Sequence, residues 1–226
     1  MTTIRVVPIQ GIPEVNPGDD IAALIADGDP RPETGDILVV TQKVVSKAEG
    51  RIVSAIDKET AIAGESRRVL RRSGQMTIAE THHGFICANA GVDSSNVVGD
   101  NVVLLPTDPD ASARRIRSRI EHLAGIDVAV LITDTFGRAW RLGQTDVTIG
   151  VAGIDPFVDY RGTTDTQGRD MVATRICLAD EIAGAAELVM GKADGICAAI
   201  VRGLSWERGR GAATDIVRSP ADDLFR

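Results

Sequence analysis

The sequence has few aromatic residues, no long apolar run and no excess of positive charge. Only 3% of its 226 residues are Phe, Trp or Tyr, so stacking on nucleic-acid bases is not expected as its main activity. No stretch approaches the roughly 20 apolar residues of a membrane span, and the N-terminal residues lack the pattern of a signal peptide. The net charge of -7 disfavours binding to nucleic acid or anionic membranes, which require a basic surface. We therefore expect a cytoplasmic protein.

Cysteine is also scarce. The three cysteines, Cys87, Cys177 and Cys197, are odd in number and too far apart for a CxxC metal motif, which predicts buried reduced thiols. Two nucleotide-binding motifs are absent as well: the phosphate loop G-x-x-x-x-G-K-[ST] and the dinucleotide fingerprint G-x-G-x-x-G. Neither Ser46 nor any cysteine has an evident base partner, so a catalytic triad cannot be argued.

The rest of the composition is that of a folded protein, with 43% hydrophobic and 25% charged residues. Runs rich in β-branched residues and helical patterns are mixed without a regular βαβ repeat. This predicts an α+β class with mixed sheets, and we treat residues 1–226 as a single domain. Strands are predicted at Ile4–Ile9, Asp36–Thr41, Met76–Glu80, Asn101–Leu105, Asp127–Thr133, Asp146–Val151 and Ala198–Arg202. Helices are predicted at Asp19–Ala26, Lys58–Arg72, Ala111–Leu123 and Asp180–Met190, and a long functional loop or hairpin at Asp155–Arg169.

The strongest candidate for chemistry is a pair of oxygen-bearing residues after an apolar strand. The strand Val128–Ile132 is expected to end at Asp134, which is followed by Thr135. Their side chains offer oxygens to a hard cation such as Mg²⁺ or Mn²⁺. Arg138 and Arg141 can then donate to phosphate or carboxylate. The alternative is a polar turn in which Asp134 only caps the next segment of the chain.

A second oxygen-rich segment begins at Asp93 and continues through Ser94, Ser95 and Asn96. Small residues just before it would let the backbone approach a ligand closely. Asp93 could share a metal ion with Asp134. An Asx turn without a ligand is the competing interpretation.

Two further segments carry lysines. In the first, a buried strand leads into Gln42, and Lys43 and Lys47 would share a face if the segment became helical. One of them could reach a phosphate, although a solvated pair is the more common outcome. In the second, Met190–Cys197, a helix end is followed by glycine and lysine. This arrangement suits a phosphate loop, and equally an ordinary helix stop at Gly191.

In this order, the segments resemble the coenzyme F420:L-glutamate ligase family, also called F420-0:gamma-glutamyl ligase. The matching stretches cover nearly the whole chain. They are GIPEVNPGDD from Gly11, GDILVVTQKVVSKAEGR from Gly35, HGFICANAGVDSSNV from His83, ITDTFGRAWRLGQTDVTIGVAG from Ile132, ADEIAGAAELVMGKADG from Ala179 and AIVRG from Ala199. The resemblance implies an unusual α+β fold of the gamma-glutamyl ligase type in an intertwined homodimer. It fits either a stand-alone ligase or the ligase part of a longer chain that continues into a nitroreductase-like domain.

The resemblance also implies a reaction. Members use GTP to join L-glutamate to the lactyl-phosphate side chain of the deazaflavin coenzyme F420-0, release GDP and phosphate, and then add γ-linked glutamates. They require Mg²⁺ or Mn²⁺, with two ions implied, and K⁺. Phosphorylation converts an unreactive carboxylate into an acyl phosphate, so no nucleophilic side chain is needed. The alternatives are a catalytically silent deazaflavin-binding domain and a metal-dependent phosphohydrolase.

The residues that the resemblance places at the site fall into two sets. The GTP-binding set is Ile12, Pro13, Glu14, Val15, Gln42, Lys47, Asn96, Met190, Gly191, Lys192, Ala193, Asp194, Gly195, Ile196 and Cys197. The metal set is Asp93, Asp134 and Thr135. Many members have an oxygen-bearing side chain near Lys192 that helps to bind the second metal. With lysine at this position, Asp194 is left to take that role.

Overall fold

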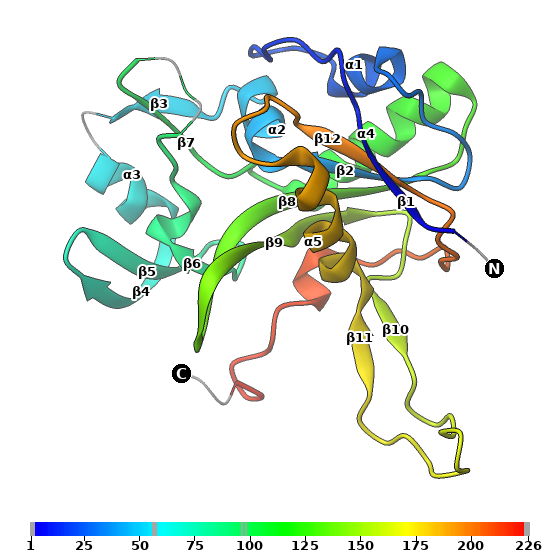
Figure 1. Cartoon of the computed structure of the whole chain (residues 1–226). Coiled ribbons are helices and arrows are strands. Elements are labelled where there is room, and N and C mark those ends of the chain that lie inside the picture. The colour runs from blue at the N-terminus through cyan, green and yellow to red at the C-terminus, as the bar shows by residue number, and fades with distance from the viewer. Residues whose placement is uncertain (1–2, 56–57, 96, 98, 224–226) are drawn as a thin grey trace.

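The computed structural model describes residues 3–55, 58–95, 97 and 99–223 (Figure 1). Its centre is a five-stranded mixed sheet with the strand order β1-β12-β2-β8-β9. The strands are β1 (Arg5–Pro8), β12 (Ala198–Arg202), β2 (Ile37–Thr41), β8 (Ala129–Arg138) and β9 (Arg141–Ala152). Only the β2–β8 pair within this sheet is parallel. The predicted α+β class with mixed sheets is confirmed.

Helices cover both faces of the central sheet. Helix α4 (Pro109–Ala124) packs on β8 and β9, and α5 (Leu178–Met190) lies on the opposite face against β9, β12 and β1 (Figure 1). Short helices α1 (Ile21–Asp27) and α2 (Gln42–Ala48) complete the first layer. Strands β2 and β12 and the first half of β8 are therefore buried on both faces, which explains their continuous Val, Ile, Leu and Ala runs.

Between α2 and α4 the chain builds a small lobe at one side of the sheet (Figure 1). It contains α3 (Lys58–Glu65), the short 3₁₀ helix η2 (Asn89–Gly91) and two small sheets. One sheet pairs β3 (Ile52–Ser54) with β7 (Asn101–Val103), and the other has the order β4 (Ser66–Ser73), β5 (Met76–Thr81), β6 (Ile86–Ala88). The lobe places residues 87–95 next to β8.

The predicted helix Lys58–Arg72 is wrong in its second half. The helix ends at Glu65, and Ser66–Ser73 forms strand β4 in a hairpin with β5. Gly74 adopts a φ of 58°, as a two-residue hairpin turn requires, and does not terminate a helix. The Arg68 guanidinium pairs with Glu80 across the hairpin. These cross-strand contacts hold an arginine-rich segment that is mostly exposed to solvent.

A second expectation is also wrong, because the strand that carries Asp134 does not end there. β8 continues to Arg138 and turns back through Ala139 and Trp140 into β9, which begins at Arg141. Asp134 is nevertheless the first β8 residue beyond the parallel pairing, whose last pair is Thr41 with Thr133. It therefore lies at the carboxyl end of β2, where that strand passes into α2.

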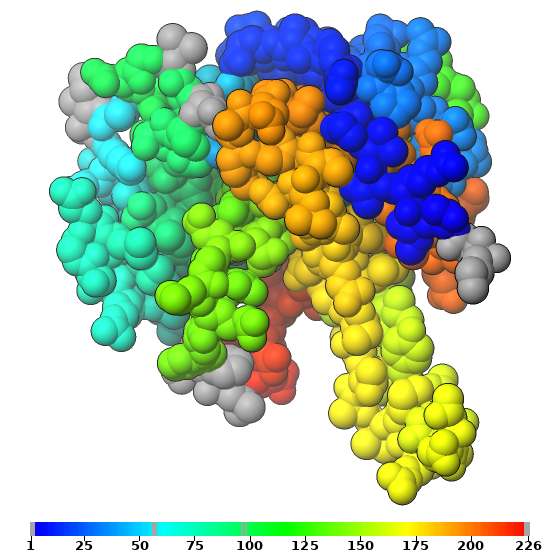
Figure 2. Space-filling model, viewed as in Figure 1, coloured from blue at the N-terminus to red at the C-terminus, as the bar shows by residue number. Residues whose placement is uncertain are grey.

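The segment predicted as a long loop or hairpin is a hairpin. Strands β10 (Phe157–Asp159) and β11 (Arg175–Cys177) pair, and residues 160–174 form an extended tip. Figure 2 shows this arm, residues 157–177, standing away from the body. The 3₁₀ helix η3 (Ala213–Asp215) follows β12. Among the described residues, no helix has the length and apolar character to cross a membrane.

Two glycine substitutions, one on the sheet and one elsewhere as a control, test the packing of α4 on the sheet. A Cβ at Gly150 on β9 would lie 2.6 Å from the Pro109 carbonyl oxygen, so Gly150→Ala should lower the free energy of unfolding by about 1–3 kcal/mol. A Cβ at Gly64 in α3 would meet nothing within 4 Å. The control Gly64→Ala should therefore raise the free energy of unfolding by up to about 1 kcal/mol, because alanine has a higher helix propensity than glycine. Urea unfolding measures both, and a neutral Gly150→Ala would contradict this packing.

Candidate functional site

Two adjoining cavities meet at Asp134. The lobe-side cavity, about 480 Å³, is lined by residues of η2, the Asp93 segment and the β8–β9 hairpin. The loop-side cavity, about 400 Å³, is lined by Glu14, Lys47 and the loop after α5. The residues common to both linings are Lys43, Asp134, Thr135 and Lys192. Segments far apart in the sequence thus converge on one carboxylate.

The parallel β2–β8 pair explains this convergence. Because parallel strands end at the same edge of a sheet, the residues that follow β2 lie beside those that follow the paired part of β8. Helix α2 begins at Gln42, directly after β2, and brings Lys43 and Lys47 to the cavity walls. Lys43 and Lys47 were expected to share a face only if this segment were helical, and the segment is a helix.

Asp134 is a carboxyl group in a poorly solvated position. Burial raises its pKa from the ordinary value of 3.8 to about 7, and the charges of Asp93 and Asp146 act in the same direction. The Thr135 backbone N–H and the Lys43 ammonium oppose this rise. Asp134 is therefore the acid of this site that most favours an added cation.

Lysines balance the two neighbouring carboxylates. Lys43 Nζ lies 2.6 Å from Asp93 Oδ2. Burial alone would raise the pKa of Asp93, but hydrogen bonds from Lys43 and Ser95 hold it below its ordinary value. The Asx-type contact from the Ser95 backbone N–H to Asp93 Oδ1, at 2.8 Å, is also present. Asp93 therefore forms a turn and faces the cavity at once.

Asp146 is a site residue that the sequence analysis missed. It is 3% exposed, and its Oδ1 accepts hydrogen bonds from Thr135 Oγ1 at 2.6 Å and from Lys192 Nζ at 2.8 Å. It stands directly opposite Thr135 in the β8–β9 hairpin. A turn at Ala139 and Trp140 alone would pair Thr135 with Gln144, and a register shift between Gly137 and Arg138 moves the pairing to Asp146.

Most of the predicted nucleotide-binding residues line the loop-side cavity. Lys47 is 7% exposed and donates to Glu14 Oε1 at 2.5 Å. Lys192 is held by Asp146 and, at 3.4 Å, by Glu187. The lining includes Glu14, Lys47, Met190, Gly191, Lys192, Ala193, Gly195, Ile196 and Cys197. Glu14 and Lys47 thus line the same cavity as the loop after α5.

The remaining predicted residues lie elsewhere. Ile12, Pro13, Val15, Gln42 and Asp194 are outside the lining of both cavities, and Asn96 is outside the described residues. Gln42 is fully buried, and its Oε1 accepts from Ser46. Its amide nitrogen has no hydrogen-bond acceptor in the described part of the chain. A buried donor of this kind is costly unless a bound molecule satisfies it.

The donor set suits a hard divalent cation that keeps part of its water shell. No three His, Cys, Asp or Glu side chains within the described ranges come together as ligands of one ion. Mg²⁺ commonly takes one or two carboxylates and completes its shell with water and substrate phosphates. Asp134, Asp93 and the Thr135 hydroxyl could supply such a partial set.

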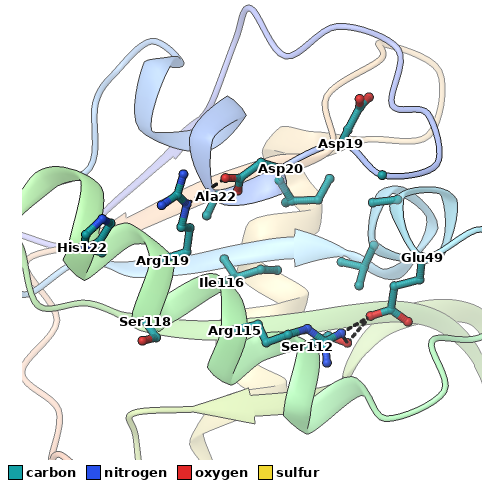
Figure 3. Close-up of a pocket in the computed structure, with 14 residues that line it drawn as sticks. Asp19, Asp20, Ala22, Glu49, Ser112, Arg115, Ile116, Ser118, Arg119 and His122 are labelled. Carbon is teal, nitrogen blue, oxygen red and sulfur yellow. Dashed lines mark hydrogen bonds and ion pairs between the residues drawn. The ribbon is translucent and has the colours of Figure 1, made fainter.

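A separate cavity of about 770 Å³ lies between α1, α2 and α4 (Figure 3). It shares no lining residue with the two cavities at Asp134. Two ion pairs span it, Arg119 with Asp20 and Arg115 with Glu49. Internal pairing leaves these groups satisfied by the protein itself, so this cavity is a weaker candidate.

Fold and site together define a mixed α+β protein with an acidic, lysine-flanked pocket suited to anionic ligands and a hard cation. The family model described as F420-0:Gamma-glutamyl ligase matches residues 10–61 and 55–203. The protein named coenzyme F420:L-glutamate ligase from Methanothermobacter thermautotrophicus is 41% identical over 99% of both chains. Proteins of the same name from Methanopyrus kandleri (41% identical, 100% of this chain and 99% of the relative) and Archaeoglobus fulgidus (40%, 99% and 96%) are similar. The chain belongs to the F420-0:gamma-glutamyl ligase family.

The raised pKa of Asp134 predicts a pH-dependent stability in metal-free buffer. Between its unfolded and folded pKa values the folded protein retains a proton that the unfolded chain loses. Wild-type stability should therefore fall as pH rises from about 4 to 7 and stay low above that range. Asp134→Asn should be more stable than wild type by roughly 4 kcal/mol above pH ~8, and equal to it near pH ~4.

Urea unfolding at several pH values measures this difference. Asp159→Asn serves as the control, because Asp159 is exposed and its pKa is lowered to about 2 by Arg161, so it should show no such gain. Parallel pH profiles for wild type and Asp134→Asn would contradict the raised pKa.

Proposed function

We propose that this protein is a GTP-dependent ligase that joins L-glutamate to the coenzyme F420-0 and then adds γ-linked glutamates. The observation that carries the proposal is the meeting of two cavities at Asp134, one lined by most of the predicted nucleotide residues and one lined by the Asp93 segment and the β8–β9 hairpin. The names of the relatives specify the coenzyme and glutamate. GTP and the acyl phosphate are our extension of those names.

In this proposal the cavity residues have distinct tasks. Asp134, Asp93 and Thr135 hold Mg²⁺ or Mn²⁺, with a second divalent ion and K⁺ nearby. When bound, these cations neutralise charge on the phosphate oxygens. Lys47 contacts the phosphates from α2, and its buried stem fixes the position of the charge. Lys43 and Lys192 form ion pairs with Asp93 and Asp146 and orient their carboxylates.

The chemistry requires that the coenzyme carboxylate approach the terminal phosphate of GTP. The carboxylate oxygen attacks phosphorus, GDP leaves, and the glutamate amine then displaces phosphate from the acyl phosphate. Both anions are brought to one place by lysines and cations, so the residues contribute mainly orientation and charge stabilisation. No nucleophilic side chain takes part.

Incubation with GTP, F420-0, glutamate and Mn²⁺, followed by mass spectrometry, tests the function. A glutamylated coenzyme formed together with GDP and phosphate is expected, and Asp134→Ala should abolish it without unfolding the protein. Coenzyme binding without turnover would instead favour a silent binding domain, a possibility raised by the Lys192–Asp146 ion pair. Phosphate release independent of the coenzyme would indicate a phosphohydrolase.

Lys47→Met tests the division of labour in nucleotide binding. A guanine-reading site leaves buried polar groups unmatched when adenine binds, so wild type should disfavour ATP roughly tenfold or more. Lys47 acts on the phosphates, so its loss should weaken GTP and ATP alike and leave their ratio unchanged. Kinetics with both nucleotides measure this, with Lys58→Met as the lysine control in the lobe. A sharp change in the ratio would show that Lys47 contacts the base.

We also propose a homodimer built through the two projecting hairpins. Leu142, beside the β8–β9 turn, is 97% exposed, and Val172 in the arm is also strongly exposed. Burial of these large apolar side chains in a contact between two copies would be favourable. Leu142→Asp should shift the sedimentation of the protein from dimer to monomer at micromolar concentration. Leu188→Asp on α5, where leucine is 82% exposed, is the control and should stay dimeric. A monomeric wild type would refute the proposal.

A further inference from the structure

A larger cavity, the aromatic cavity, lies between the β4–β5 hairpin, the β8–β9 hairpin and the C-terminal segment. Its volume of about 860 Å³ falls within the range of small-molecule pockets, roughly 300–1,000 Å³. The rings of Phe85 and Phe136 line it and meet edge to face with centroids 6.5 Å apart. Two of only four phenylalanines in the chain thus stand in one cavity wall.

Exposed apolar side chains gather around the same cavity. Val69, Leu70 and Ile86 all line it, although each is more than a third exposed to solvent. A cluster of large apolar groups left in water is unfavourable and is typical of a surface that binds an apolar ligand. A flat aromatic molecule would cover these side chains and lie against the two phenyl rings.

The lining also includes an unsatisfied buried hydroxyl. Thr148 is 4% exposed, and its hydroxyl has no hydrogen-bond partner among residues 3–55, 58–95, 97 and 99–223. Its backbone N–H donates to Asp180 Oδ1 at 2.8 Å, and Asp180 lines the cavity too. The Thr148 hydroxyl can donate to a carbonyl and the Asp180 carboxylate can accept from a ring N–H, so together they suit the polar edge of a heterocycle.

Phe136 connects the aromatic cavity with Asp134. It lines both this cavity and the lobe-side cavity, and it is two residues from Asp134 on β8. A ligand whose ring occupied the aromatic cavity could extend a side chain past Phe136 to the junction of the two smaller cavities. Arg71 and Arg218 also line the aromatic cavity and can pair with an anionic group on that side chain.

We propose that the aromatic cavity binds the ring of the acceptor substrate. The ligand class is a planar aromatic heterocycle with an imide-like edge and an anionic side chain. The ring lies against Phe85 and Phe136, its polar edge faces Thr148 and Asp180, and its side chain reaches Asp134. This inference rests on the proposed ligase function, and it assigns the acceptor to a part of the molecule separate from the nucleotide residues.

Binding of F420-0, followed by the fluorescence of its ring, tests the assignment. Ile86→Glu places a charge on an exposed position of the cavity and should weaken binding at least tenfold. Arg71→Gln should weaken it about tenfold through the lost charge-assisted hydrogen bond. The matched control Arg72→Gln alters the next, equally exposed residue of β4, which is outside the lining, and should change binding less than twofold. GTP binding should be unchanged in all three variants.

Thr148→Val provides a second test that does not depend on exposed residues. Removing an unsatisfied buried hydroxyl should leave stability equal or higher, and should weaken coenzyme binding several-fold if that hydroxyl meets the ring. This opposite movement of stability and affinity is not expected of a residue with only a structural role. A variant that binds the coenzyme as well as wild type would overturn the assignment of Thr148 to the ring edge.

The outcomes separate this inference from the proposed function. If wild type glutamylates the coenzyme while Ile86→Glu and Arg71→Gln bind it normally, the cavity assignment is wrong and the function stands. If wild type binds the coenzyme here but forms no product, the assignment stands and the function fails. Conversion of a wild-type dimer to a monomer by Ile86→Glu would show that a second copy of the chain covers the cavity, and would overturn the assignment.

Discussion

The poorly solvated carboxyl of Asp134 is the constraint on which the rest of the site depends. A carboxylate in this position, beside two further acids, is unfavourable unless positive charge is brought close to it. Lys43 and Lys192 form ion pairs with the neighbouring acids, and no lysine of the described residues forms an ion pair with Asp134 itself. An added cation, with phosphate to complete its shell, is the natural complement of such a group.

The packing of the central sheet explains why a polar cavity can form at Asp134. Strands β2 and β12 and the first half of β8 are apolar on both faces and can be buried only because α4 and α5 cover the sheet from two sides (Figure 1). Asp134 follows at the point where β2 has left the sheet and β8 has lost its parallel neighbour. A polar cavity can open there without exposing the core, and the lobe and the loop after α5 close around it.

Helices and strands were predicted correctly from the sequence where their local residue patterns are clear. The apolar run Ala198–Arg202 and the helices α4 and α5 were predicted to within about two residues at each end, because burial and helix ends leave clear patterns. The prediction of a helix was wrong at β4, whose arginines are exposed and whose strand is stabilised by cross-strand contacts. Asp146 was missed for a related reason, since only the hairpin register places that residue against Thr135. Contacts between distant segments leave no local pattern to recognise.

In the proposed reaction, the carboxylate of the acceptor and the terminal phosphate of GTP meet at Asp134 and react there. A heavy oxygen isotope placed in both oxygens of the F420-0 carboxylate and followed into the released phosphate tests this reaction. If the acyl phosphate forms, each amide made must be accompanied by one phosphate that carries an isotope atom from the carboxylate. Phosphate free of the isotope, released in step with amide formation, would contradict the account.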